Sequence, residues 1–185
     1  MIVRVIKVLI NIILANMKLL ILNLLNPKSL KYHPFNFISF NCSVTLFSRG
    51  KIVLGKKVKI NSHSTLSAID GGLLKVGNNS FINNNCQIVS HKSITIGDDV
   101  MIGPNVVIVD HNHKYNNKGI LKKEYKSDDI IIGNNVWIGA NSVILKGTRI
   151  GNNSIVAAGS VIHGEYDEKS LIVQKRNTEI RKIEE

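Results

Sequence analysis

The sequence predicts an all-β fold in which the chain winds into a parallel β-helix, and three observations support this prediction. Ile, Val or Leu recurs every six residues through most of the chain, at positions that we call anchors. A small residue lies four positions after eleven of the fifteen anchors, and Gly directly follows seven of them. A period of six fits neither an α-helix nor a simple two-residue alternation. It fits a β-helix in which each hexad forms one short side of a coil.

The anchors fall into five sets of three, and three hexads would close one triangular turn, so we expect about five coils. The sets are Leu54, Ile60, Leu66; Val76, Ile82, Ile88; Ile96, Ile102, Ile108; Ile132, Ile138, Ile144; and Ile150, Val156, Ile162. The four hexads without a small residue all lie third in a set, where the chain leaves the coil or the repeat ends. We therefore predict a β-helix domain over residues 54–166.

Glycine and asparagine mark the expected corners of the coil. We interpret the Gly after an anchor, as in Gly55 or Gly139, as a tight corner with positive φ. Paired asparagines such as Asn78-Asn79 and Asn134-Asn135 fit the same need, because Asn tolerates the left-handed region better than most residues.

Composition and charge narrow the class of protein. The chain has 185 residues, a length typical of one domain. Apolar residues make up 44% of it, which is enough for a core. Cys42 and Cys86 have no metal-ligand or CxxC spacing, so we expect no metal and a reducing compartment. The net charge is +11, but no basic-aromatic platform or nucleic-acid motif accompanies it, so we expect no nucleic-acid partner.

Residues 1–26 predict an apolar helix that ends before Pro27. Arg4, Lys7, Asn11 and Lys18 would form one narrow polar stripe on it. Residues 1–69 hold ten Lys or Arg and no Asp or Glu, which favours a helix lying on an anionic membrane surface with its basic stripe, Lys18 included, toward the headgroups. The alternative is a helix packed on the β-helix or on another subunit. A signal peptide or a spanning helix fits less well, because Lys lies inside the apolar run.

Three further segments lie outside the regular repeat. Residues 27–53 form a lead-in segment, in which Phe40, Leu46 and Ile52 keep the spacing of six and would be the anchors of an imperfect first coil. The longest insertion, residues 110–129, is polar and carries His111 and His113 near its start. We expect it to leave the coil as a loop near the working face, as insertions in solenoids do. Residues 167–185 form the C-terminal segment.

The stretch from Leu54 to Ile162 resembles the hexapeptide-repeat acyltransferases, in particular the galactoside, maltose and polysaccharide O-acetyltransferase branch. The most specific part reads IGDDVMIGPNVVIVDHNH, followed by IIIGNNVWIGANSVILKGTRIGNNSIVAAGSVI. The resemblance implies a left-handed coil, a homotrimer, and acetyl-CoA bound between neighbouring subunits.

Transfer of an acetyl group to a sugar hydroxyl needs a proton acceptor, and an imidazole titrating near neutral pH suits this role. The resemblance places the general base at His113, eleven residues after Ile102, with His111 as the alternative. Asp110 would orient an imidazole. Direct transfer needs no acyl-enzyme when both substrates are held together.

The same resemblance assigns the binding residues. Asn83 would contact the acceptor, and His91 replaces the family's acceptor-binding acid, which leaves the acceptor open. Trp137, Gly139, Ala140 and Ala158 would line the acetyl-CoA arm. The family's closing Gly-Asn-Pro segment is missing, and Lys175, Arg176 or Arg181 would supply charge for the CoA phosphate.

We therefore expect an acetyl-CoA-dependent O-acetyltransferase that acts on a surface polysaccharide or its precursor, in the cytoplasm at the inner face of the cell membrane. Two alternatives stay open: N-acetylation of an amino sugar or other small acceptor, and a non-catalytic β-helix in a glycan-synthesis complex. The sequence also leaves open whether the acyl group is acetyl or longer.

Overall fold

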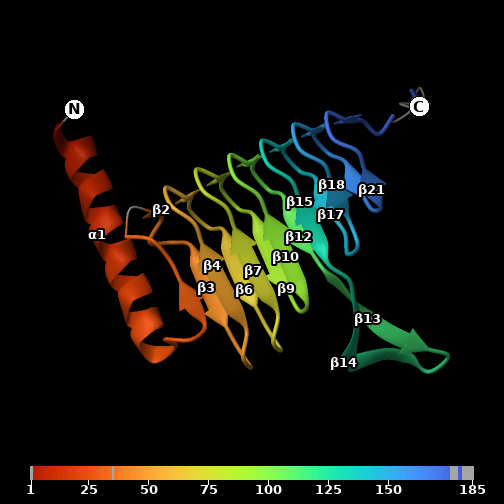
Figure 1. Ribbon diagram of the computed structural model, residues 1–185, viewed down its shortest axis with the longest axis horizontal. Coiled ribbons are helices and arrows are strands. Elements are labelled where there is room, and N and C mark those ends of the chain that lie inside the picture. The colour runs from red at the N-terminus through yellow and green to blue at the C-terminus, as the bar shows by residue number, and fades with distance from the viewer. Residues whose placement is uncertain (1, 35, 176–178, 181–185) are drawn as a thin grey trace, which may run out of the picture.

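The computed structural model is a parallel β-helix with one α-helix across its N-terminal end and one hairpin projecting from its side (Figure 1). It describes residues 2–34, 36–175, 179 and 180, with only the backbone for residues 2–5 and 7–9. Helix α1 spans Ile2–Leu25. The coil that follows has three flat sides, each a parallel sheet built from successive turns.

The three sides are named here sheets A, B and C. Sheet A contains β1 (Leu30–Lys31), β4 (Lys51–Leu54), β7 (Leu73–Val76), β10 (Ser93–Ile96), β15 (Ile130–Ile132), β18 (Arg149–Ile150) and β21 (Glu165–Tyr166). Sheet B contains β2 (Phe37–Ile38), β5 (Lys59–Ile60), β8 (Phe81–Ile82), β11 (Met101–Ile102), β16 (Trp137–Ile138), β19 (Ile155–Val156) and β22 (Leu171–Ile172). Sheet C contains β3 (Ser43–Leu46), β6 (Thr65–Ala68), β9 (Gln87–Ser90), β12 (Val107–Val109), β17 (Val143–Ile144) and β20 (Val161–Ile162).

The predicted β-helix is confirmed, and every one of the fifteen anchors is at most 4% exposed. Equivalent anchors stack from turn to turn, as Ile82, Ile102 and Ile138 do in sheet B. The small residues four positions later are also buried at the corners, for example Val58, Cys86 and Ser142. The core is therefore a narrow column of aliphatic side chains.

The coil contains the five turns expected over residues 54–166, the first turn expected in the lead-in segment, and the start of one more. Six turns are complete, and β21 and β22 begin a seventh. The first turn lies in residues 30–46, and of the three anchors expected in the lead-in segment Ile52 is buried and Leu46 packs against the core, but Phe40 was wrong. Ile38 and Val44 hold the inward positions, in register with Ile60 and Leu66, whereas Phe40 is 45% exposed. This turn keeps the spacing of six, but its anchors lie two residues before Phe40 and Leu46, so the expected register was two residues out.

The glycines that follow anchors are needed for a different reason than the one predicted. Gly139 does not have positive φ; a Cβ there would lie 2.5 Å from the backbone nitrogen of Ala158 in the next turn. The left-handed residues lie two positions further on, and Asn79, Asn135 and Asn153 are among them. Gly is required here by the close approach of neighbouring turns, while Asn supplies the corner conformation.

Helix α1 closes the N-terminal end of the coil through its polar stripe. Lys18 Nζ donates to the backbone oxygen of Cys42 at 2.6 Å, and Asn11 Oδ1 accepts the backbone N–H of Phe40 at 3.0 Å. Ala15 and Leu19 are buried beside these contacts. The expectation that Lys18 faces lipid headgroups was therefore wrong, because Lys18 pairs with backbone groups of the first turn.

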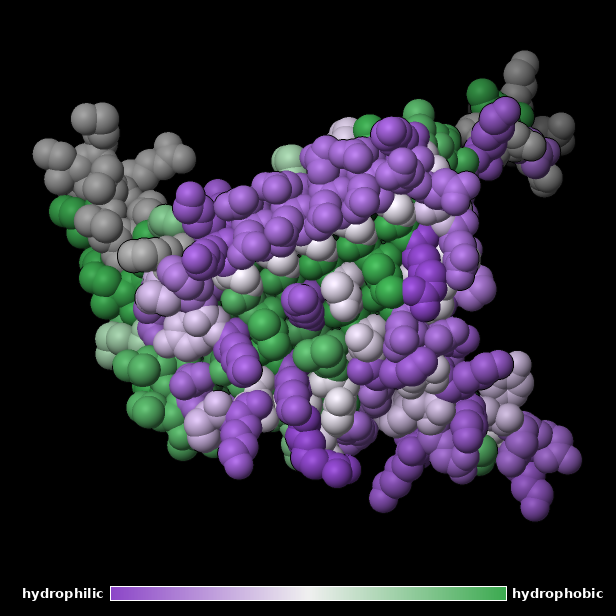
Figure 2. Space-filling view, viewed as in Figure 1, coloured by the Kyte–Doolittle hydropathy of each residue, from purple (hydrophilic) through white to green (hydrophobic). Residues whose placement is uncertain are grey.

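The opposite side of α1 is apolar and uncovered in this chain, and Figure 2 shows hydrophobic surface over the helix. Its exposed residues are Ile6, Ile10, Ile13, Leu14, Met17, Leu20, Ile21, Leu24 and Leu25. Within the part of the chain that the structure describes, no helix has the length and hydropathy needed to cross a membrane.

Candidate active site

The long insertion leaves the coil at the corner between sheets C and A. Strand β12 ends at Val109, and the inserted residues form an antiparallel hairpin of β13 (His111–Asn116) and β14 (Gly119–Ser127). The hairpin is closed at its base, where the backbone N–H of Asp128 donates to the Asp110 carbonyl at 2.9 Å. This bond joins the two ends of the insertion at the coil, and the hairpin projects from the side of the β-helix (Figure 1).

Asp110 is the fixed centre of this corner. Its carboxylate has no exposed surface and accepts four hydrogen bonds. The donors are the Ser90 hydroxyl, the backbone N–H groups of His91 and Lys92, and His111 Nδ1, at 2.8 to 3.2 Å. Burial alone would raise the pKa of Asp110, but these bonds, led by that from His111, outweigh it and hold the pKa below its usual range. Asp110 is therefore an anion at neutral pH.

His91 and His111 stack beside this carboxylate. Their ring centroids are 3.9 Å apart, and their side chains are 8% and 15% exposed. His91 Nδ1 also lies 3.7 Å from the Asp70 carboxylate of the preceding turn. Burial and the neighbouring His111 lower the pKa of His91, although Asp70 and Asp110 oppose the shift. His91 is therefore uncharged at neutral pH.

His113 lies two residues after His111 on β13, and its side chain is exposed. The hairpin register pairs it with Tyr125 of β14, and their ring centroids are 4.7 Å apart. The ring centroid of Tyr125 also lies 4.3 Å from that of His91 and 5.4 Å from that of His111, so one aromatic ring packs against all three histidines. Sequence reasoning missed Tyr125. The only available signal was an aromatic residue in a polar insertion, and the hairpin register that pairs it with His113 was not predicted.

A second group of predicted residues gathers on sheet B. Asn83, Trp137 and Ala140 line a hollow of about 260 Å³ together with Phe81 and Met101. Gly139 and Ala158 follow along the same side, where their turns approach closely. The walls are mostly apolar, and Trp137 is 52% exposed. A hollow of this lining fits a flexible, largely apolar ligand arm.

The two groups do not meet within one chain. Asn83 follows a strand of sheet B, whereas His111 and His113 follow a strand of sheet C. No contact between the groups is found among the described residues. Lys175 is exposed just beyond β22, while Arg176 and Arg181 lie outside the described residues. No cluster of three or more potential metal ligands occurs in the described ranges.

Comparisons with known proteins match the repeat on both sides of the insertion. Residues 129–164 match the family described as "Bacterial transferase hexapeptide (six repeats)", and residues 74–109 match "Hexapeptide repeat of succinyl-transferase". The chain is 31% identical over 150 residues to a putative lipopolysaccharide biosynthesis O-acetyl transferase, WbbJ, of Escherichia coli (strain K12), covering 76% of each chain. It is 41% identical over 92 residues to the galactoside O-acetyltransferase of the same organism, covering 50% of this chain and 45% of that one.

A solved structure agrees with these matches. The hexapeptide-repeat-containing acetyltransferase VCA0836 of Vibrio cholerae superposes with a TM-score of 0.56 at 32% identity, over 62% of this chain and 64% of that one. The same protein has been solved in complex with acetyl coenzyme A, where the TM-score is 0.50 at 30% identity, over 67% of this chain and 62% of that one. The chain thus spans about half the length of the galactoside enzyme and about two thirds or more of the others.

Proposed function

Since this chain belongs to the hexapeptide-repeat acetyltransferases, we propose that it transfers an acetyl group from acetyl-CoA to a hydroxyl of a sugar in a surface polysaccharide or its precursor. The observation that carries the proposal is the exposed His113 imidazole, which packs on Tyr125, whose ring also contacts His111, the partner of the buried Asp110. The named activities of the relatives and the acetyl coenzyme A complex of VCA0836 support the donor.

In the proposed reaction the acceptor oxygen attacks the thioester carbonyl while His113 accepts its proton. The tetrahedral intermediate then expels the CoA thiolate, which takes up that proton. His113 is preferred as the base because its ring is exposed, whereas His111 is mostly buried and donates to Asp110. His111 remains the alternative. The backbone N–H of Ala140, in the sheet B hollow, would stabilise the developing oxyanion.

The donor would lie along sheet B. The hollow at Trp137 and Ala140 suits the pantetheine arm, and Lys175, Arg176 and Arg181 would meet the phosphates near the C-terminal end. Asn83 would contact the acceptor from the same hollow.

A homotrimer would bring the two groups of residues together across a subunit boundary. The outer face of sheet B supports this proposal, because Met101, Trp137, Ile155 and Leu171 are in register and 37 to 68% exposed. An apolar column of this kind is typical of a surface covered by another subunit. His113 of one subunit would then face the Asn83 and Trp137 hollow of the next.

Helix α1 would give the enzyme a peripheral contact with the inner face of the cell membrane. Its outer side is apolar. The neighbouring first turns of the coil are positively charged, because the sequence before Asp70 contains Lys and Arg but no Asp or Glu.

Thiol release from acetyl-CoA in the presence of sugar acceptors tests the proposed function. We expect acceptor-dependent release together with a mass gain of one acetyl on the acceptor. Acetyl-CoA binding without transfer to any glycan fraction would favour another acceptor, and no acetyl-CoA binding would favour the non-catalytic alternative.

A further inference from the structure

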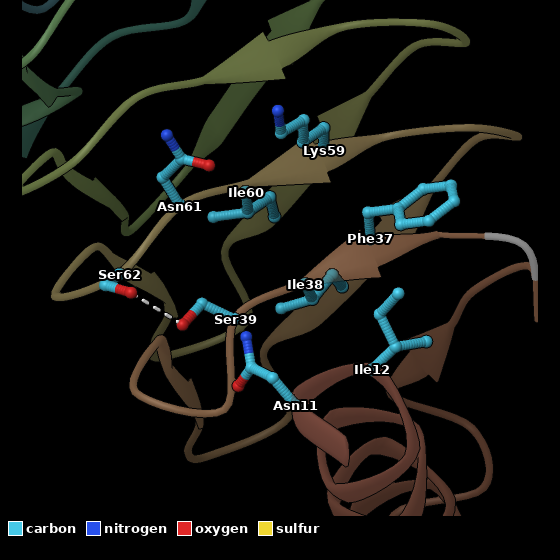
Figure 3. A pocket seen from close by; sticks show the side chains of 9 residues that line it. All are labelled: Asn11, Ile12, Phe37, Ile38, Ser39, Lys59, Ile60, Asn61 and Ser62. Carbon is cyan, nitrogen blue, oxygen red and sulfur yellow. Dashed lines mark hydrogen bonds between the residues drawn. The ribbon is translucent and has the colours of Figure 1, made fainter. Parts of the chain in front are cut away.

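A second hollow, of about 250 Å³, lies where helix α1 meets the first two turns of sheet B (Figure 3). Its walls come from three segments that are distant in sequence: residues 11 and 12 of the helix, 37–39 of the first turn and 59–62 of the second. The buried Ile38 and Ile60 contribute to its lining. The volume is just below the range of about 300–1,000 Å³ typical of ligand sites, which suits a ligand of about one sugar ring.

The lining combines hydroxyl and amide groups with an aromatic ring. Ser39 and Ser62 face one another, with their hydroxyl oxygens 2.8 Å apart, and Asn11 and Asn61 border the same space (Figure 3). Phe37, which is 52% exposed, stands on the other side. Hydroxyl and amide groups satisfy the hydroxyls of a saccharide, and an apolar ring covers its C–H face.

This hollow adjoins the proposed transfer site. Asn61 Nδ2 donates to Asn83 Oδ1 at 3.2 Å, and Lys59 Nζ lies 5.1 Å from the centroid of the Phe81 ring. Asn83 and Phe81 line the sheet B hollow assigned to the reaction. An acceptor with its reacting sugar beside Asn83 would therefore extend its neighbouring unit into the space between Lys59 and Ser62.

The charge of the hollow is positive, because no acidic residue is among the described residues that line it. Lys59 is its charged member, and the sequence holds no Asp or Glu before Asp70. A phosphate or carboxylate on the bound saccharide would form a charge-assisted bond with Lys59, which is stronger than a bond between neutral groups.

We propose that this hollow is a second acceptor subsite, which binds an acidic saccharide unit next to the sugar that is acetylated. The inference rests on the proposed function for its place in the reaction, but the binding itself can be measured without turnover. The shared chemistry is a negatively charged sugar, and the charge comes either from a phosphate or from a uronic carboxylate.

Amide NMR titration of the full chain with four probes tests the subsite: glucose, glucose 1-phosphate, glucuronic acid and inorganic phosphate. We expect the amide signals of Asn61 and Ser62 to shift with an acidic sugar, and to shift less with glucose or with inorganic phosphate. A response to glucose 1-phosphate alone would identify the phosphate source, and a response to glucuronic acid would identify the carboxylate source. Lys59→Gln should weaken binding of the acidic sugar about tenfold or more, because one charged bond is lost.

Lys75→Gln is the matched control, since Lys75 is exposed on sheet A, outside the hollow. Equal weakening by both variants would reduce the effect to general surface charge and would overturn the subsite. Binding of inorganic phosphate as tight as that of glucose 1-phosphate would overturn its saccharide selectivity. An enzyme that acetylates sugars but shows no shift at Asn61 would overturn the subsite and leave the proposed function standing. Specific binding of the acidic sugar by a chain that transfers no acetyl group would support the binding site and overturn the proposed function.

Discussion

His111 Nδ1 lies 3.2 Å from Oδ1 of Asp110, a carboxylate with no exposed surface. Because Asp110 also accepts from Ser90 and two backbone N–H groups, it is held in place by the coil itself. The bond therefore anchors the first residue of the projecting hairpin to the rigid β-helix. The ring of Tyr125 contacts both His111 and His113, so the position of His113 also depends on this bond.

Removing the proposed base should abolish most turnover. We expect His113→Ala to lower kcat by about 10² to 10⁴-fold, as loss of a general base does, with binding of acetyl-CoA retained. His111→Ala should have the smaller effect, because its ring positions the hairpin. Steady-state kinetics and calorimetry on both variants check this, and a larger loss in His111→Ala would assign the base to His111.

Tyr125 should position His113 through the face of its ring. Tyr125→Phe keeps the ring, so kcat should stay close to that of the unaltered enzyme. Tyr125→Leu removes it, and we expect kcat to fall at least about tenfold with KM for acetyl-CoA unchanged, because a small misplacement of a catalytic group is costly. Equal activity in the Phe and Leu variants would argue against this role.

Stability should depend on pH through His91. Its pKa is lowered in the folded chain by burial and by His111, so the unfolded chain binds more protons once the pH falls below about 6.5. Stability is therefore fully present above that pH and decreases as the pH falls toward the folded pKa. Thermal unfolding between pH 7.5 and 5 should show a falling Tm, and His91→Gln should flatten the decline. A parallel decline in both proteins would place the titrating group elsewhere.

The apolar column on sheet B should hold the proposed trimer together. Met101→Glu would place a charge in a contact that excludes water, so we expect dissociation to smaller species in light scattering after size exclusion. Lys75→Glu on sheet A is the control and should leave the assembly intact. A monomeric unaltered protein would remove the basis for this proposal.

The outer side of α1 should bind anionic membranes. Leu20→Gln with Leu24→Gln, at residues 52% and 70% exposed, should weaken cosedimentation with phosphatidylglycerol vesicles, because apolar area available for insertion is lost. Ile120→Gln, an exposed residue of the hairpin, should leave binding unchanged. No difference between the double variant and this control would contradict the membrane contact.

The sequence by itself determined the coil. Each hexad buries its anchor and its small corner residue against the same positions one turn away, so the pattern is local, repeated and readable from Leu54 to Ile162. In the first turn a spacing of six fits both Ile38 with Val44 and Phe40 with Leu46, so the register could not be predicted, because only pairing with the next turn fixes it. The role of Gly139 was misread for the same reason, since the constraint comes from Ala158 in another turn.

Only the tertiary structure decided how the site residues are arranged. The pairing of His113 with Tyr125 depends on the hairpin register, and the stacking of His91 on His111 depends on two turns closing at one corner. By its chemistry alone, the Lys18 ammonium could bind either a lipid headgroup or a backbone carbonyl. Because α1 packs on the first turn, Lys18 donates to the carbonyl of Cys42. A periodic pattern specifies which side chains face inward, but contacts between interrupted segments depend on distances that a linear sequence does not contain.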